Sequence, residues 1–146
     1  MTLHFAYGSN MSRPLMLARC RDAQALGVAT LAGWRFVINR EGYGSIAPWA
    51  GGVVHGVLWR LSARDLAAVN AYESVSTGLY LRHRLGVRLG ARHVAALVYI
   101  TPQGGQGRTR PGYIDLVIEA ARDWKLPERH IRSLARWSPS GWRGVR

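Results

Sequence analysis

The stretch LHFAYGSN at residues 3–10 decides how the chain begins to fold. Residues 3–7 are mostly apolar or aromatic, which is the pattern of a short buried strand. The run stops at Gly8, and the two small polar residues after it favour a tight turn. Ser12 stands where a helix N-cap is expected, with Pro14 in the first turn, where its missing N–H costs little. The sequence therefore predicts a strand, a glycine-containing turn and a short helix in immediate succession.

Strand-like segments fill most of the middle of the chain, and helical segments close it. The strands are rich in Val, Ile, Leu and Trp, whereas the helical segments place apolar residues three and four positions apart. The expected strands are residues 25–31, 33–39, 52–61, 80–89 and 94–101, and the expected helices are residues 62–73, 113–124 and a last one that opens at 127–128 and stops at Pro139 and Gly141. Strands in consecutive runs, without strict alternation with helices, predict an α+β fold with a strongly curved or barrel-like mixed sheet.

Length and composition limit the class of protein. The 146 residues suit one domain, residues 1–146, and the 48% hydrophobic content argues against disorder. No stretch approaches the roughly 18 apolar residues of a spanning helix, and residues 1–4 lack the basic start of a secretory signal. Cys20 is the single cysteine, which excludes a disulfide framework and fits a reducing cytoplasm, and the five histidines are scattered. We therefore expect a cytoplasmic protein with no metal site and no membrane span.

The charge balance suggests a nucleic-acid partner, but the charge pattern argues against one. Twenty basic residues against eight acidic ones give a formal net charge of +12, the footprint of a nucleic-acid binder. Nineteen of the twenty are arginines, spread from Arg13 to Arg146 without a block of consecutive charges or a known RNA- or DNA-binding motif. We therefore expect a solvated, Arg-rich exterior.

The acidic residues are few enough to be judged singly, and Glu73 stands apart. Asp65 has the spacing of a capping box with Ser62, and Glu119 has the helix spacing to pair with Arg122. Glu73 instead follows the end of an apolar helix, and no basic residue lies between positions 64 and 82. Desolvation there would raise the pKa of the carboxyl group into the range useful for proton transfer. The alternative is a solvated glutamate at a helix end.

Five short segments of the sequence carry a family resemblance. FAYGSNM at residues 5–11, VLWRL at 57–61, YE at 72–73, TGLY at 77–80 and RPGY at 110–113 resemble the gamma-glutamylcyclotransferase family over nearly the whole chain. Two positions depart from the family pattern. Members often carry Asp where Asn70 stands and Gly where Ser74 follows the glutamate.

The resemblance implies a small mixed β-barrel with flanking helices and a reaction without metal or cofactor. In that reaction the α-amine of a small gamma-glutamyl substrate attacks its own γ-carbonyl, closes 5-oxoproline and expels an amino acid or amine, as in glutathione metabolism. Glu73 maps onto the family's acid/base. The remaining expected site residues bind substrate, although core packing is an alternative for each tyrosine outside the turn. They are Tyr7, Gly8, Ser9 and Asn10 in the turn, together with Tyr80 and Tyr113.

Two other classes of function stay open. One is a cyclotransferase that acts on a gamma-glutamyl group carried by a protein or a lysine side chain, for which the +12 charge would suit an acidic carrier. The other is a non-catalytic, Arg-rich nucleic-acid-binding module that keeps the fold. The sequence does not identify the leaving group or the pathway, and it leaves open whether the protein forms a homodimer.

Overall fold

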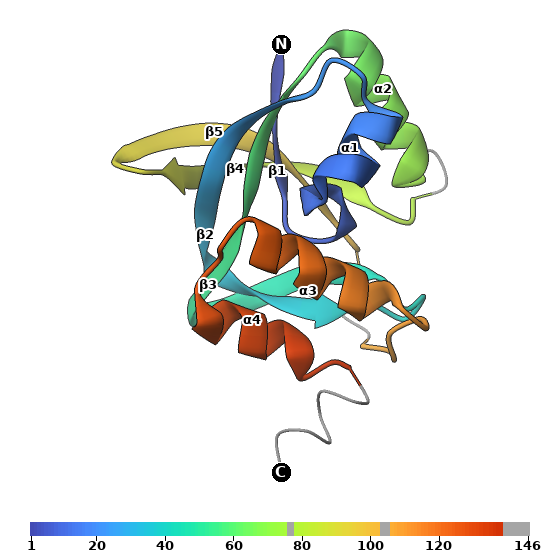
Figure 1. The fold of residues 1–146 in the computed structure, drawn as a ribbon, viewed down its shortest axis with the longest axis vertical. Helices are drawn as coiled ribbons and strands as arrows, with labels where there is room; N and C mark the ends of the chain where they lie inside the picture. Colours follow the sequence, from blue (N-terminus) through green and yellow to red (C-terminus); the bar gives the residue numbers. More distant parts are fainter. Residues whose placement is uncertain (76–77, 103–105, 139–146) are drawn as a thin grey trace.

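Five strands close into a barrel in the order β1-β3-β2-β4-β5 (Figure 1). The computed structural model describes residues 1–75, 78–102 and 106–138. The strands are β1 (Thr2–Ala6), β2 (Gln24–Ile38), β3 (Gly44–Leu61), β4 (Leu81–Leu89) and β5 (Arg92–Ile100). The helices are the 3-10 turn η1 (Ser9–Met11), α1 (Arg13–Arg19), α2 (Ala63–Tyr72), α3 (Tyr113–Asp123) and α4 (Glu128–Ala135). All strand pairs are antiparallel except β1 with β5, so the sheet is mixed and the predicted α+β barrel is confirmed.

The hairpin of β2 and β3 is longer than the sequence predicts. The expected break between residues 25–31 and 33–39 is a register shift within one continuous strand, where Gly33 adopts a φ of 89°. A glycine at such a bulge lets the strand bend without leaving its ladder. Strand β3 begins at Gly44 instead of residue 52, and its early part contains Pro48, a residue that strand propensities disfavour.

The two N-caps expected from the sequence are confirmed. Leu15 N–H donates to Ser12 Oγ at 3.3 Å, and Asp65 N–H donates to Ser62 Oγ at 3.1 Å. The carboxylate of Asp65 is used differently from the expected capping box. It is buried and accepts a hydrogen bond from the Asp22 backbone N–H at 3.0 Å, which ties α2 to the segment before β2.

Helices α3 and α4 lie side by side across the curled β2–β3 hairpin, while α1 and α2 lie together at the other end of the barrel (Figure 1). The indole N–H of Trp124, just after α3, donates to Met11 O at 2.7 Å and fixes α3 against η1. Arg122 pairs with Glu128 at 3.7 Å, and not with the expected Glu119. That pair is solvent-exposed and contributes little stability.

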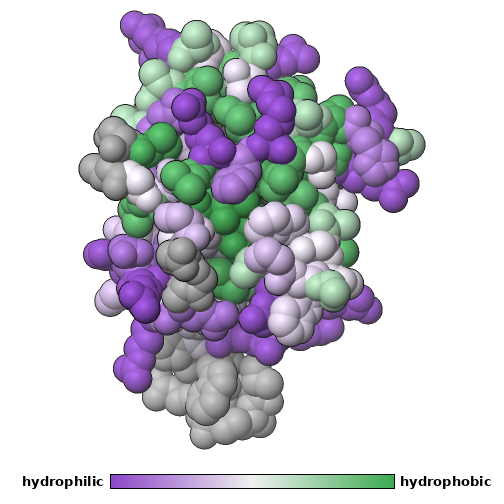
Figure 2. Space-filling view, turned by 180° about the vertical axis from the view of Figure 1, so that it is seen from behind, coloured by the Kyte–Doolittle hydropathy of each residue, from purple (hydrophilic) through white to green (hydrophobic). Residues whose placement is uncertain are grey.

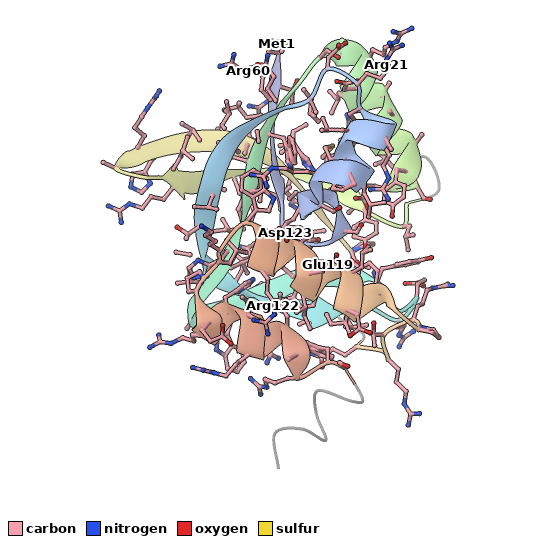
Figure 3. The ribbon with its side chains drawn as sticks, viewed as in Figure 1. Met1, Arg21, Arg60, Glu119, Arg122 and Asp123 are labelled. Carbon is pink, nitrogen blue, oxygen red and sulfur yellow. The ribbon has the colours of Figure 1, made fainter. Side chains whose placement is uncertain are left out.

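Charged side chains are distributed over the surface. Figure 3 shows Arg21 and Arg60 at one end of the molecule and Arg122 on α3, far from both. On the opposite face, hydrophilic side chains lie around the edge and over the upper middle, with apolar surface between them (Figure 2). Within the described part of the chain, no helix is long and apolar enough to cross a membrane. Thr77 of the TGLY motif and the expected helix stop at Pro139 and Gly141 lie outside the described residues.

Candidate active site

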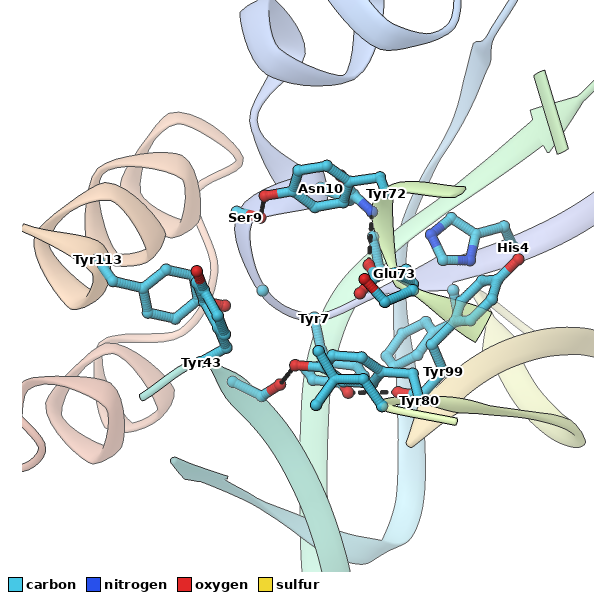
Figure 4. A pocket seen from close by; sticks show the side chains of 16 residues that line it. His4, Tyr7, Ser9, Asn10, Tyr43, Tyr72, Glu73, Tyr80, Tyr99 and Tyr113 are labelled. Carbon is cyan, nitrogen blue, oxygen red and sulfur yellow. Dashed lines mark hydrogen bonds between the residues drawn. The ribbon is translucent and has the colours of Figure 1, made fainter. Parts of the chain in front are cut away.

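A cavity of about 230 Å³ opens where the end of β1 and η1 meet the end of α2 (Figure 4). Among the described residues that line it, Glu73 is the one carboxylate. All six tyrosines of the chain also line it, although they come from segments far apart in the sequence. They are Tyr7, Tyr43, Tyr72, Tyr80, Tyr99 and Tyr113. The structure therefore places one carboxyl group in a cavity that is lined by phenol rings.

Glu73 is held where α2 ends. Its backbone N–H donates to Val69 O at 2.9 Å, and its carboxylate accepts a hydrogen bond from Asn10 Nδ2 at 3.1 Å. Burial raises the pKa of the Glu73 carboxyl group to about 7, although the positive charge of Arg19 acts in the opposite direction. Ser74 then turns the chain with a φ of 52°, in the left-handed region that glycine favours. That conformation explains why a glycine suits this position in the family pattern.

The turn after β1 lies across the cavity from Tyr80, just before β4, and from Tyr99 of β5 (Figure 4). Ser9 Oγ lies 3.4 Å from the hydroxyl of Tyr72, and Asn10 is buried. Gly8 has a φ of −118°, outside the left-handed region, so a positive φ is not the reason for a glycine there. The lack of space requires a glycine, because a Cβ atom at Gly8 would lie 2.8 Å from the hydroxyl oxygen of Tyr113.

Tyr113 projects from the start of α3 and closes the turn from the other side. Burial raises the pKa of the Tyr113 hydroxyl well above its usual range, while the backbone N–H groups of Gly44 and Ser9 act in the opposite direction. The backbone N–H of Ser9, in the turn that the sequence predicts to bind substrate, therefore interacts with the hydroxyl oxygen of Tyr113 beside the cavity.

The hydroxyl groups of three other tyrosines are fixed by hydrogen bonds. Tyr7 donates to the Tyr99 carbonyl oxygen, Tyr80 donates to Gly44 O at 2.5 Å, and Tyr99 donates to Asn70 Oδ1 at 2.5 Å. Burial raises the pKa of each hydroxyl, that of Tyr99 to about 12. These three phenols are therefore neutral at physiological pH, and their hydrogen bonds hold the rings in place before a ligand binds. Aromatic faces attract cations, so the wall suits an ammonium group.

All seven site residues expected from the sequence lie around this one cavity. The lining residues that were not predicted as site residues include His4, Tyr43, Tyr72 and Tyr99. Arg19, which donates a hydrogen bond to Asn10, was not predicted either. Tyr43 packs edge-to-face on Tyr113 with ring centroids 5.6 Å apart, and His4 packs likewise on Tyr99 at 5.3 Å. Burial lowers the pKa of His4 to about 4, so its ring is neutral. Nothing in the spacing along one chain marks these residues, because their neighbours are distant in sequence.

A closed five-stranded barrel with this arrangement of helices is a fold that solved structures share. The solved structure described as "Gamma-glutamyl cyclotransferase" superposes with a TM-score of 0.87 at 22% sequence identity, and the match covers 94% of this chain and 88% of that one. The "Gamma-glutamylcyclotransferase" of Mus musculus is 23% identical over an alignment of 154 positions, gaps included, that covers 97% of this chain and 81% of the mouse protein. The protein of the same name from Homo sapiens is 22% identical over an alignment of 153 positions, with the same coverage.

The sequence profile described as "Gamma-glutamyl cyclotransferase, AIG2-like" matches residues 4–126. The chain therefore belongs to the Gamma-glutamyl cyclotransferase, AIG2-like family. The matched region contains Glu73 and all six tyrosines of the cavity.

Proposed function

We propose that the protein is a gamma-glutamylcyclotransferase that converts the gamma-glutamyl group of an amino acid or amine conjugate into 5-oxoproline. The observation that carries the proposal is a single carboxyl group, with its pKa near 7, enclosed by neutral phenol rings. The names of the related proteins support the same class of reaction.

The proposed reaction moves protons between groups that the cavity holds close together. The Glu73 carboxylate accepts a proton from the α-ammonium of the substrate, and the freed amine attacks the carbonyl carbon of its own side-chain amide. A new C–N bond closes the five-membered lactam, and the C–N bond to the leaving amine breaks. The protonated Glu73 returns the proton to the departing nitrogen, and the ring nitrogen loses its second proton through the same carboxylate, so that the amine leaves as an ammonium ion. Nucleophile and electrophile belong to one molecule, so the protein has to fold the substrate and relay these protons.

The neighbouring residues have separate roles in this proposal. The aromatic wall holds the α-ammonium before it loses its proton. Tyr113, whose oxygen receives backbone donors, donates a hydrogen bond from its hydroxyl group to the substrate carboxylate or the developing oxyanion. Ser9, Asn10, Tyr7 and Tyr80 complete the binding surface. No step requires a metal or cofactor, and the buried free thiol of Cys20 suits a cytoplasmic protein.

The direct test is detection of free 5-oxoproline after incubation with a panel of gamma-glutamyl compounds. The panel contains gamma-glutamyl amino acids, a gamma-glutamyl amine, and a gamma-glutamyl group on the side chain of a lysine in a protein. Release from the small compounds supports the proposal. Release from the protein conjugate alone would favour the carrier-linked alternative, and no release from any of them would overturn the assignment.

The raised pKa of Glu73 predicts the pH dependence of this activity. Only the ionised carboxylate accepts a proton, so we expect kcat/KM to rise with pH through about 7 and then to level off. Initial rates of 5-oxoproline release, measured across a series of buffers of equal ionic strength, give this profile. An activity already at its plateau near pH 5 would contradict a role for a carboxyl group with a pKa of about 7.

The net charge of +12 leads to a prediction that separates the proposed enzyme from the nucleic-acid-binding alternative. If the arginines form only a solvated exterior, duplex DNA and RNA will bind weakly, without sequence preference, and the affinity will collapse as salt is raised. Fluorescence anisotropy with labelled duplexes at two salt concentrations measures this. Sequence-selective binding that survives high salt would favour the binding-module alternative.

A further inference from the structure

Asn10 links Glu73 to a cation that does not itself line the cavity. Arg19, the last residue of α1, donates a hydrogen bond from Nη1 to Asn10 Oδ1. Asn10 in turn donates from Nδ2 to Glu73 Oε1 at 3.1 Å. The chain Arg19–Asn10–Glu73 therefore connects α1, η1 and the end of α2 through one amide group.

The donors and acceptors of these three side chains fix the direction of both hydrogen bonds. A guanidinium group has only donors, so the amide must turn its oxygen toward Arg19. Its NH₂ group is then left for Glu73, where it stabilises a carboxylate oxygen. Without Arg19, the amide of the buried Asn10 would be free to turn over and present its oxygen to the carboxyl group, which favours the protonated acid.

Arg19 is itself held in place by a second contact. Its guanidinium carbon lies 3.4 Å from the ring centroid of Tyr72, the residue before Glu73. Stacking on an aromatic face fixes the plane of the guanidinium group and, with it, the direction of its donors. The Tyr72 hydroxyl also lies 3.4 Å from Ser9 Oγ, so the ring on which Arg19 stacks contacts the same turn that contains Asn10.

The other ionisable groups around Glu73 carry no charge at neutral pH. Tyr7 from the end of β1, Tyr80 before β4, Tyr99 from β5 and Tyr113 from α3 interact with the Glu73 charge, and burial raises the pKa of each. The neutral His4 ring lines the same cavity from β1. Arg19 is the charged group that favours the ionised form of Glu73.

We propose that Arg19 is a positioning residue for the cyclisation: it fixes the orientation of the Asn10 amide and thereby keeps the Glu73 carboxylate ready to accept the α-ammonium proton. This inference rests on the proposed function for its catalytic meaning, but its structural content concerns the free protein. Arg19→Met removes the donors and the charge while keeping an unbranched stem, and Arg19→Lys restores a charge and a donor without the planar fork.

Arg13 provides a matched control. It lies on the same helix and also stacks on an aromatic ring, with its guanidinium carbon 3.7 Å from the ring centroid of Trp124. It makes no contribution to the charge balance at Glu73. Arg13→Met therefore tests what the loss of a stacked arginine on α1 does in general.

The first measurement needs no substrate. The chain has four glutamates, so ¹³C labelling of glutamate side chains gives four carboxyl signals, and Glu73→Gln identifies the signal of Glu73. We expect the pKa of Glu73 to rise by about one unit in Arg19→Met, to rise less in Arg19→Lys and to stay unchanged in Arg13→Met. An unchanged Glu73 titration in folded Arg19→Met would overturn the inference.

The second measurement connects the titration to turnover. In Arg19→Met the acidic limb of the kcat/KM profile should shift upward with the pKa, so the rate falls about tenfold at low pH and recovers at high pH. A purely structural defect would lower the rate at every pH, and that result would also refute the inference. If the wild-type protein releases no 5-oxoproline, the proposed function fails, while the titration still tests the link between Arg19 and Glu73.

Discussion

We expect Glu73→Gln to lower turnover by roughly 10²–10⁴-fold, the range associated with loss of a general acid/base. Glutamine keeps the shape of the side chain and still accepts the hydrogen bond from Asn10 Nδ2, but it cannot take up a proton. Substrate affinity should change little, because the aromatic wall and the turn remain. Steady-state kinetics together with equilibrium binding of an unreactive substrate analogue separates the two effects. Turnover within a few fold of wild type would remove Glu73 from the mechanism.

The same variant should change how stability depends on pH. The pKa of Glu73 rises from 4.5 in the unfolded chain to about 7 in the folded protein. Between these values the folded state binds more protons than the unfolded state, so this group makes the protein less stable as pH rises through the window. Glutamine carries no charge at any pH, so it avoids this loss of stability. We therefore expect the Tm of Glu73→Gln to exceed that of wild type above pH 7 and to approach it below pH 4.5. A Tm difference that does not depend on pH would show that Glu73 is solvated.

Features that depend on a few neighbouring residues could be predicted from the sequence. Ser12 and Ser62 cap their helices as expected, because a cap hydrogen bond joins residues three positions apart. Glu73 could be singled out because no basic residue is near it in sequence. Its actual burial depends on tyrosines from other strands and helices, and local spacing carries no information about those.

The parts that could not be predicted depend on contacts between distant segments. The start of β3 contains Pro48, and it pairs because β2 lies alongside with Trp34 opposite. Arg19 is one of the many arginines that the sequence assigns to a solvated exterior, and only the fold shows that it meets Tyr72. The packing around Gly8 could not be predicted either, because Tyr113 is distant in the sequence. The glycine makes room for the hydroxyl of Tyr113.

This packing makes Gly8→Val the second substitution with a large expected effect. The added Cβ would lie 2.8 Å from the Tyr113 hydroxyl oxygen, closer than real Cβ atoms come, so either the turn or the ring must shift. Both belong to the proposed binding surface. A shift of about 1 Å in such a surface lowers rates by about 10²-fold. We therefore expect Gly8→Val to abolish measurable 5-oxoproline release, whereas Ser9→Ala removes one hydroxyl and leaves residual activity.

Gly86→Val is the matched control for this experiment. Gly86 lies in β4, and a Cβ atom there would meet nothing within 4 Å, so the same change in side chain should leave activity near the wild-type value. Circular dichroism confirms that each variant is folded before its kinetics are compared. A folded Gly8→Val enzyme with unchanged kcat/KM would mean that substrate does not lie against this turn, and the proposed site would then be misplaced.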